Sequence, residues 1–421
     1  MTDDSSPRST GPAPDRTMTR YHKFLIFILS VATFFEGYDY MVINLILPLL
    51  GKETGASAQT LGNMVAIINI GTIVAFFVIR LADRFGRRPI LLLTIILYTG
   101  FTALTAFSRG LTDFTIYQFL ARVFLVSEWG LAAVILAEEL PAGVRGFGIA
   151  IVQCAAAFGA VLSAGLFPKL STTAFGWRSL YLIGLIPLVL MTWLRRDLKE
   201  TRRFLTARAE MAADRARARF FTVLTRPYLK RTVSLMALWW MSWVALTAVQ
   251  VFWAYHAINE RGWTLAAVSK AMTISYTIGL SGYLVCGKLM DRLGRRPTSL
   301  IFFLGGAAAI AWTFLETRTL PMYLAIGFCV FFITAYLPIC STYTTELFPT
   351  HLRANAAAWT NNTVGRTGCV IAPALVGQMA LYLGGTGQAV AAIALCPLIG
   401  ALLILLFFPE TKQRELEEIS K

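Results

Sequence analysis

Long stretches without any charged residue are the feature that most limits how this chain can fold. Two of them run from Phe24 to Phe35 and from Pro89 to Ser108, and similar stretches recur along the whole sequence. A helix needs about 20 apolar residues to cross the hydrocarbon core of a bilayer. Only 14% of the 421 residues are charged, against about 25% in a soluble protein. The sequence therefore predicts an integral membrane protein whose surroundings are the lipid bilayer.

The net charge of +15 comes from basic residues that gather in alternate loops. The segment 195–231 alone has twelve Lys and Arg residues and four acidic ones. Lys and Arg accumulate in cytoplasmic loops of membrane proteins. We therefore expect both termini in the cytoplasm, an even number of spans and, given the short loops, a bacterial inner membrane. This placement of charge argues against nucleic acid as a partner.

The apolar stretches divide the chain into two sets of six predicted spans. The first set is predicted at 24–50, 60–80, 89–107, 112–137, 146–170 and 177–195. The second set is predicted at 230–256, 265–286, 298–315, 320–343, 354–382 and 388–408. This gives a tail (1–23), a first bundle (24–195), a basic linker (196–229), a second bundle (230–408) and a second tail (409–421).

The two sets of spans are copies of one unit. The segment 83–89, DRFGRRP, recurs 208 residues later at 291–297 as DRLGRRP. The same offset relates Glu138 to Glu346 and Pro141 to Pro349. Two independent motifs at one offset predict a six-helix unit that is duplicated in parallel.

The repeated segment resembles the loop between the second and third helices of the major facilitator superfamily, and the resemblance covers essentially the whole chain. It implies an all-α membrane protein with twelve transmembrane helices in two parallel six-helix bundles, working as a monomer. It also implies that the charged loop residues form a cytoplasmic gate. These residues are Asp83, Arg84, Arg87, Arg88, Asp291, Arg292, Arg295 and Arg296. A purely topological role, holding the loops inside, is the alternative.

Five charged residues inside predicted spans have no charged counterpart at the 208-residue offset. They are Glu36, Asp39, Arg122, Glu128 and Arg366. An ionisable side chain deep in a membrane costs several kcal/mol unless it faces a partner or a wet cavity. The helical rise places all but Glu128 roughly 15–22 Å from a helix end, near one level in the membrane. Glu128 falls closer to the cytoplasmic side. We therefore expect a functional site at this level.

Glu36 and Asp39 are three residues apart and share a helix face. Two carboxylates this close repel each other, so one of them binds a proton more readily than an isolated carboxylate does. We predict Asp39 as the proton-carrying group, with Glu36 and Glu128 as further candidates and Arg122 as the counter-ion. The alternative is a static Asp39–Arg122 bridge between two helices.

Arg366 is predicted to bind an anionic substrate, because its guanidinium stays charged and its planar set of donors fits a carboxylate. Asn361 and Asn362 add polar groups one turn earlier. Weaker candidates for substrate contact are Gln250, Tyr276 and Tyr336. The alternative for Arg366 is a structural role on backbone carbonyls of a neighbouring helix.

A finer resemblance concerns helices 1 and 4. The run Glu36-Gly37-Tyr38-Asp39 resembles the acidic pair of aromatic-acid and other organic-acid proton symporters. Ser127-Glu128-Trp129-Gly130 after Arg122 resembles metabolite and sialate symporters. The resemblance implies proton-coupled symport of a small organic anion, with the proton as the coupling ion and no other cofactor.

The sequence has three alternative interpretations. A proton-antiport exporter of a drug or amphiphilic metabolite would suit the acidic pair, but Arg366 disfavours cations. A non-transporting sensor or receptor with the same fold is a second possibility. An enzyme is not expected, because the sequence offers no metal-binding cluster, nucleotide-binding loop or nucleophile with its base.

Overall fold

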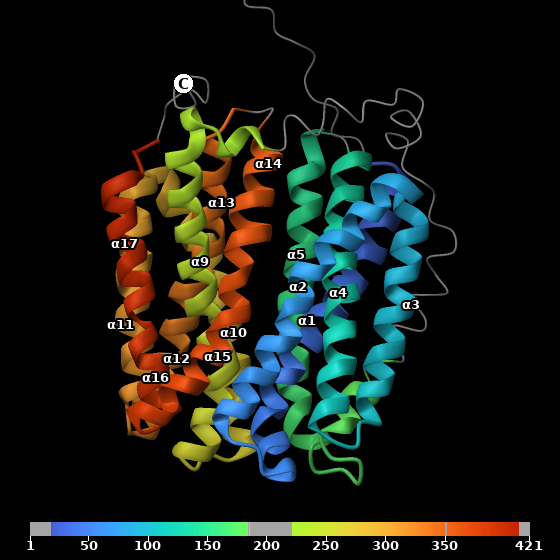
Figure 1. Ribbon diagram of the computed structural model, residues 1–421, viewed down its shortest axis with the longest axis vertical. Coiled ribbons are helices and arrows are strands. Elements are labelled where there is room, and N and C mark those ends of the chain that lie inside the picture. Colours follow the sequence, from blue (N-terminus) through green and yellow to red (C-terminus); the bar gives the residue numbers. More distant parts are fainter. Residues whose placement is uncertain (1–17, 141, 184, 186–220, 350–351, 412–421) are drawn as a thin grey trace, which may run out of the picture.

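The computed structural model describes residues 18–140, 142–183, 185, 221–349 and 352–411, and shows two helical bundles side by side (Figure 1). The first bundle contains α1 (Arg20–Thr54), α2 (Ala58–Phe85), α3 (Arg87–Ala106), α4 (Leu111–Glu139) and α5 (Ala142–Leu170). Helix resumes over 178–183, where the sixth span was predicted. The remainder of that span and residues 196–220 of the predicted linker lie outside the described residues.

The second bundle follows the short 3₁₀ turn η2 (Thr222–Leu224). Its helices are α9 (Arg226–Tyr255), the π-helical η3 (His256–Glu260), α10 (Leu265–Arg292), α11 (Arg295–Leu315), α12 (Thr319–Thr334), α13 (Tyr336–Glu346), α14 (Arg353–Ala357), the π-helical η4 (Ala358–Gly365), α15 (Arg366–Leu383), α16 (Thr386–Ile393) and α17 (Leu395–Phe407). Each predicted span that the structure describes corresponds to a helix or a chain of helices.

Three predicted spans are interrupted, which the hydropathy pattern did not indicate. Proline explains two of the breaks, because it lacks an N–H and its ring displaces the carbonyl four residues earlier. Pro338 stands four residues after Thr334, where α12 ends, and Pro397 stands four residues after Ile393, where α16 ends. The third interruption is η4, which precedes Arg366.

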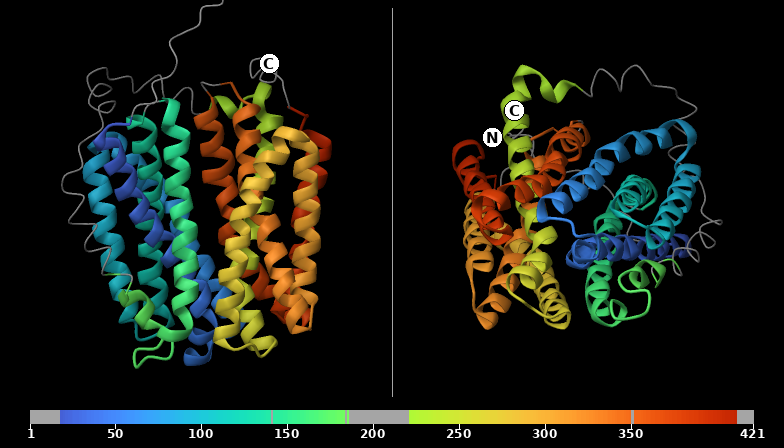
Figure 2. Two further views of the ribbon diagram at one scale, coloured as in Figure 1. Left: turned by 180° about the vertical axis from the view of Figure 1, so that it is seen from behind. Right: turned by 60° about the horizontal axis from the view of Figure 1, so that its bottom comes forward.

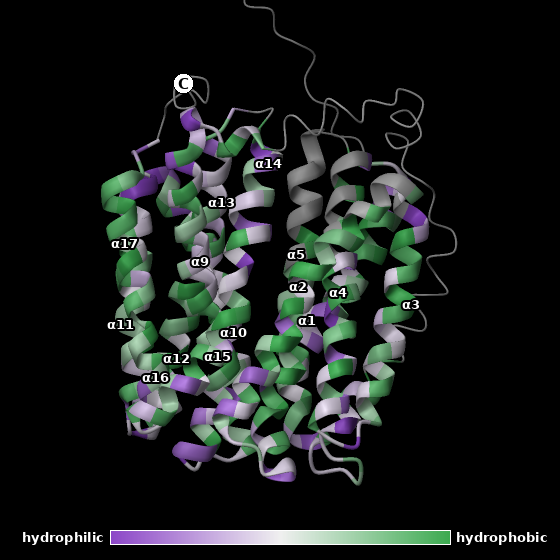
Figure 3. Cartoon of the chain, viewed as in Figure 1, coloured by the Kyte–Doolittle hydropathy of each residue, from purple (hydrophilic) through white to green (hydrophobic). Residues whose placement is uncertain are grey.

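Residues of high hydropathy recur along the helices of both bundles, as the colouring of Figure 3 shows. Large residues such as Phe77, Phe107 and Leu284 are exposed there, which is the pattern of a surface that meets lipid. Eight helical segments of the described chain are long and apolar enough to cross a membrane. The helices α4 and α10, of 29 and 28 residues, are not among these eight and carry polar residues between their ends.

We call the end of the molecule that holds the repeated segments 83–89 and 291–297 the motif end. The first described helix begins at this end and the last one finishes there, since Leu25 packs against Ile90 and Glu410 contacts Arg295. In Figures 1 and 2 the two bundles converge toward the other end, which we call the opposite end.

Hydrogen bonds between the bundles run from the middle of the helices toward the opposite end. Asn69 of α2 donates to the backbone carbonyl of Cys369 in α15 at 2.8 Å. Pro373 makes that carbonyl available, because it supplies no N–H to the position four residues earlier. Ser269 of α10 likewise donates to the carbonyl of Ala164 in α5, which Pro168 leaves free in the same way. Two prolines thus free the carbonyl acceptors of these two hydrogen bonds.

Candidate functional site

The acidic pair lies in the middle of α1, where this helix crosses α5. Glu36 and Asp39 are 5% and 6% exposed. Gly37, between them, lies so close to the backbone of Ala156 that a Cβ atom there would overlap it, and Gly159 approaches the Phe34 carbonyl in the same way. Small residues let two membrane helices pack backbone to backbone. This close crossing fixes both carboxylates inside the first bundle.

Arg122 of α4 is 4% exposed, and its guanidinium lies over the ring of Tyr40, 4.6 Å from the centroid. Its charge acts on the Asp39 carboxylate. The ion pairs among the described residues do not include one between Asp39 and Arg122. Arg122 therefore lies between the acidic pair and an aromatic ring, and its predicted role as counter-ion stays a prediction.

Arg366 starts α15, directly after the π-helical turn η4. Its guanidinium lies 5.4 Å from the centroid of the Trp243 ring in α9. The Trp243 indole is held in turn, because its N–H donates to the Oδ1 of Asn361 at 2.9 Å. Asn361 thus orients the aromatic ring on which Arg366 lies, whereas Asn362 is exposed.

Tyr40 joins the two bundles at this level. Its hydroxyl donates to the Oε1 of Gln250 in α9 at 3.4 Å, and the charges of both Arg122 and Arg366 act on it. Three side chains of the second bundle differ from the buried acidic pair, since Gln250, Trp243 and Arg366 are only partly buried although they stand in the middle of their spans. Partial exposure at this depth indicates that they line a space between the bundles.

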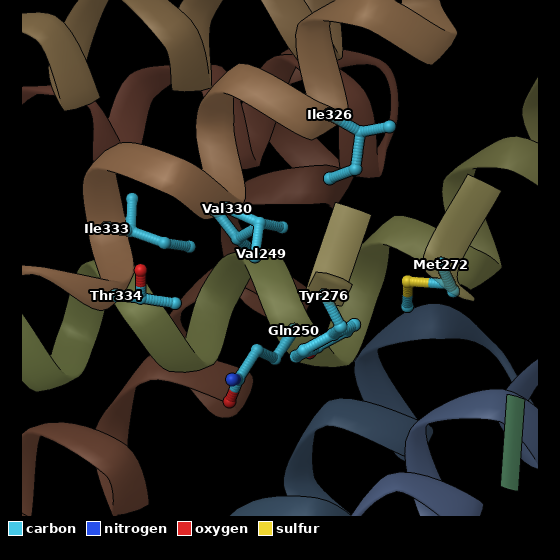
Figure 4. Close-up of a pocket in the computed structure, with 8 residues that line it drawn as sticks. All are labelled: Val249, Gln250, Met272, Tyr276, Ile326, Val330, Ile333 and Thr334. Atoms are coloured by element: carbon cyan, nitrogen blue, oxygen red, sulfur yellow. The ribbon is translucent and has the colours of Figure 1, made fainter. Parts of the chain in front are cut away.

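A pocket extends from this level into the second bundle. Its lining residues are Val249, Gln250, Met272, Tyr276, Ile326, Val330, Ile333 and Thr334. The space that atoms leave free is about 260 Å³, part of it open. Figure 4 shows Gln250 and Tyr276 next to each other on one side and the apolar side chains of α12 on the other. The interior of the pocket is therefore apolar, and an amide and a phenol lie at its edge.

Two other predicted residues lie elsewhere. Tyr336 packs inside the second bundle with its ring 4.3 Å from that of Phe303, and it does not line the pocket. Glu128 is 1% exposed within α4, six residues closer to the motif end than Arg122.

The second copy of the predicted gate forms a network within the second bundle. Arg295 contacts Glu346 at 3.0 Å and Asp291 at 3.6 Å. Glu410 accepts from the backbone N–H groups of Arg295 and Arg296 at 2.8 and 3.0 Å, so a carboxylate caps the positive N-terminus of α11. This role of Glu410 was not predicted. Arg292 is exposed at the same end.

In the first copy, Arg88 is exposed. The side chains of Asp83, Arg84 and Arg87 lie outside what the structure describes. The gate role of both copies stays a prediction.

Sequence reasoning missed Tyr40 and Trp243 as members of the site. A usable signal existed for Tyr40, which directly follows the acidic pair. The sequence did not distinguish Trp243 from Trp239 and Trp240, because all three stand in the same aromatic-rich segment.

Comparison with known proteins agrees with this architecture. The model of the Major Facilitator Superfamily matches residues 29–373 and 258–420. The chain is 26% identical to the niacin transporter NiaP of Acinetobacter baylyi, covering 95% of this chain and 97% of that one. It is 26% identical to the 4-hydroxybenzoate transporter PcaK of the same organism, covering 85% and 84%. It is 24% identical to the sialic acid transporter NanX of Escherichia coli, covering 88% and 90%.

Among solved structures, the crystal structure of a D-xylose–proton symporter matches with a TM-score of 0.75 at 20% identity, covering 93% of this chain and 99% of that one. This likeness concerns the fold. The predicted architecture of two parallel six-helix bundles is confirmed, and so is the expectation of a transporter in place of an enzyme. The chain belongs to the Major Facilitator Superfamily.

Proposed function

We propose that this protein is a proton-coupled symporter of a small aromatic carboxylate. The observation that carries the proposal is the placement of two guanidinium groups from different bundles, Arg122 and Arg366, whose charges both act on Tyr40. Two cations in a site of low dielectric repel each other. A bound carboxylate would relieve this repulsion and accept hydrogen bonds from either group.

The surroundings of the two cations suit an aromatic ring. Trp243 and Tyr40 each lie against a guanidinium, and the pocket beyond them is mostly apolar. Gln250 and Tyr276 at its edge would contact a polar substituent on the ring. Niacin, 4-hydroxybenzoate and sialic acid, which the relatives' names mention, are all small carboxylic acids, and the first two are aromatic.

The buried acidic pair supports proton coupling. Asp39 lies inside the first bundle, one helical turn from Glu36 and within the field of Arg122. A substrate anion that draws Arg122 toward the cavity would weaken the attraction between Arg122 and Asp39. The Asp39 carboxylate would then take up a proton. Proton and anion would cross together, with less net charge moved than by the anion alone.

We further propose that the motif end faces the cytoplasm and that the structure is the inward-facing state. The positive residues of the loops support this orientation. The contacts of Asn69 and Ser269 across the bundles support closure of the outer side. Rocking of the two bundles around a central site is the usual route of alternating access.

Uptake into proteoliposomes tests this function directly. Labelled nicotinate, 4-hydroxybenzoate, sialic acid and an organic cation are offered under an inward proton gradient. We expect saturable uptake of an aromatic acid that a protonophore abolishes. Arg366→Ala should weaken uptake about 10- to 100-fold, because it removes charge-assisted hydrogen bonds. Arg366→Lys should recover part of the loss, and Arg109→Ala, an exposed arginine, should leave uptake unchanged.

Other outcomes would replace the proposal. Exchange of the organic cation for protons, without anion uptake, would favour the exporter. Binding of an acid without any transport would favour a receptor. Uptake of sialic acid alone would keep the symport mechanism and contradict the aromatic substrate class.

A further inference from the structure

Tyr98 of α3 lies fully buried between the helices that carry the charges of the first bundle. Its ring packs in one cluster with Ala121 and Leu125 of α4 and with Phe35 of α1. Leu125 is three residues from Arg122 and three from Glu128, so all three follow one inclined row on α4. A ring that packs on Leu125 therefore places its hydroxyl near both charged residues of that helix.

Four charged groups from two helices act electrostatically on the hydroxyl of Tyr98. Asp39 and Glu36 act on it from α1, and Glu128 and Arg122 act on it from α4. The hydroxyl lies beside the Asp39 carboxylate, yet it makes no hydrogen bond of normal geometry with any residue that the structure describes. A buried hydroxyl that is not committed to one acceptor can donate to whichever neighbouring carboxylate is ionised.

We propose that Tyr98 is a positioning residue of proton coupling, whose single O–H group turns between the carboxylates of Asp39 and Glu128. This inference rests on the proposed proton symport. An ionised Asp39 accepts the O–H bond, and a protonated Asp39 releases it toward Glu128. Proton release at Asp39 and the charge state of Glu128, which lies closer to the motif end, are thereby linked through one side chain. The switch involves rotation of the hydroxyl only, with no covalent step.

The test uses Tyr98→Phe, which keeps the ring and removes the hydroxyl. Without this donor an ionised Asp39 is less stable, so the pH midpoint of gradient-driven nicotinate or 4-hydroxybenzoate uptake should rise by about one unit. Exchange of labelled for unlabelled acid at equal pH should persist, because the substrate site is intact. Tyr181→Phe is the matched control, since Tyr181 is equally buried and feels Asp39 and Arg122 but neither Glu36 nor Glu128.

A second variant keeps the test decisive if Tyr98→Phe also slows exchange. In a Glu128→Gln background the additional Tyr98→Phe substitution should shift the pH midpoint further than it does alone, because protonated Asp39 then has no bond from Tyr98 to an ionised Glu128 to lose, and only ionised Asp39 loses its donor. Equal shifts in both backgrounds, or equal shifts for Tyr98→Phe and Tyr181→Phe, would overturn the inference. Absence of proton-driven uptake in the unsubstituted protein would instead overturn the proposed symport.

Discussion

Asp39 and Arg366 stand at one level of the molecule but in different bundles, and their surroundings differ accordingly. Asp39 is enclosed by α1, α3 and α4, together with Glu36 and Tyr98. Arg366 is half-buried beside Trp243 at the edge of the space between the bundles. The asymmetry of charge between the two halves thus places the carboxylates inside the first bundle and Arg366 beside the space between the bundles.

At this scale we predict the effect of Asp39→Asn, which keeps the size of the side chain but cannot gain or lose a proton near neutral pH. Accumulation of the aromatic acid against its gradient should be lost, while exchange of labelled for unlabelled acid should continue. Both rates are measured in the same proteoliposomes. Asp113→Asn, at the opposite end of α4, is the control. If Asp39→Asn still accumulates the acid, another carboxylate carries the proton, and Glu36 is the first candidate.

At the scale of helices, glycine and proline decide where the bundles touch. Gly62 of α2 lies so close to the Pro373 carbonyl of α15 that a Cβ atom would overlap it, and Gly377 packs against Gln59 in the same crossing. Pro373 also frees the Cys369 carbonyl for Asn69. One proline therefore shapes the close contact and supplies its acceptor.

Gly62→Ala should disturb this crossing without unfolding either bundle. Overpacking costs about 1–3 kcal/mol, so the conformation closed at the opposite end should become roughly tenfold less populated and uptake should slow by a similar factor. Initial uptake rates at saturating acid measure the effect. Gly165→Ala, where an added Cβ meets open space, should transport normally. Equal rates for the two variants would mean that the crossing does not limit the cycle.

At the scale of the whole molecule, the proposed cycle of alternating access requires that the contacts at the opposite end break and re-form each time. Cys369 is 4% exposed in the closed arrangement, and its carbonyl is one side of the Asn69 hydrogen bond. Its accessibility therefore reports which end is open.

Asn69→Ala should raise the labelling of Cys369 by a membrane-impermeant maleimide added to the outside of intact cells. Loss of one hydrogen bond costs about 1 kcal/mol, which changes the ratio of the two conformations roughly fivefold. The experiment uses a background in which the other five cysteines are replaced. Thr60→Ala is the control, because the Thr60 side chain on the same helix bonds, among the described residues, to Ser57 of its own bundle. Unchanged labelling in Asn69→Ala would show that this bond does not hold the outer side closed.

Much of the architecture was predictable because it depends on local properties of the chain. The length of apolar stretches determines the spans, the offset between motifs determines the duplication, and the helical rise places Asp39, Arg122 and Arg366 at one level. None of these inferences requires knowledge of how one helix is rotated against another.

The identity of the neighbours was decided only by the tertiary structure. Tyr336 and Tyr276 looked alike in sequence, yet the first stacks on Phe303 and the second lines the pocket. The sequence around Tyr98 did not indicate a role, because the residues that surround it come from three helices that meet only in the folded protein. The sequence by itself determined which groups lie deep in the membrane, since depth follows from position along one helix. Only the packing of helices, which sets rotation and crossing, determined which of those groups meet.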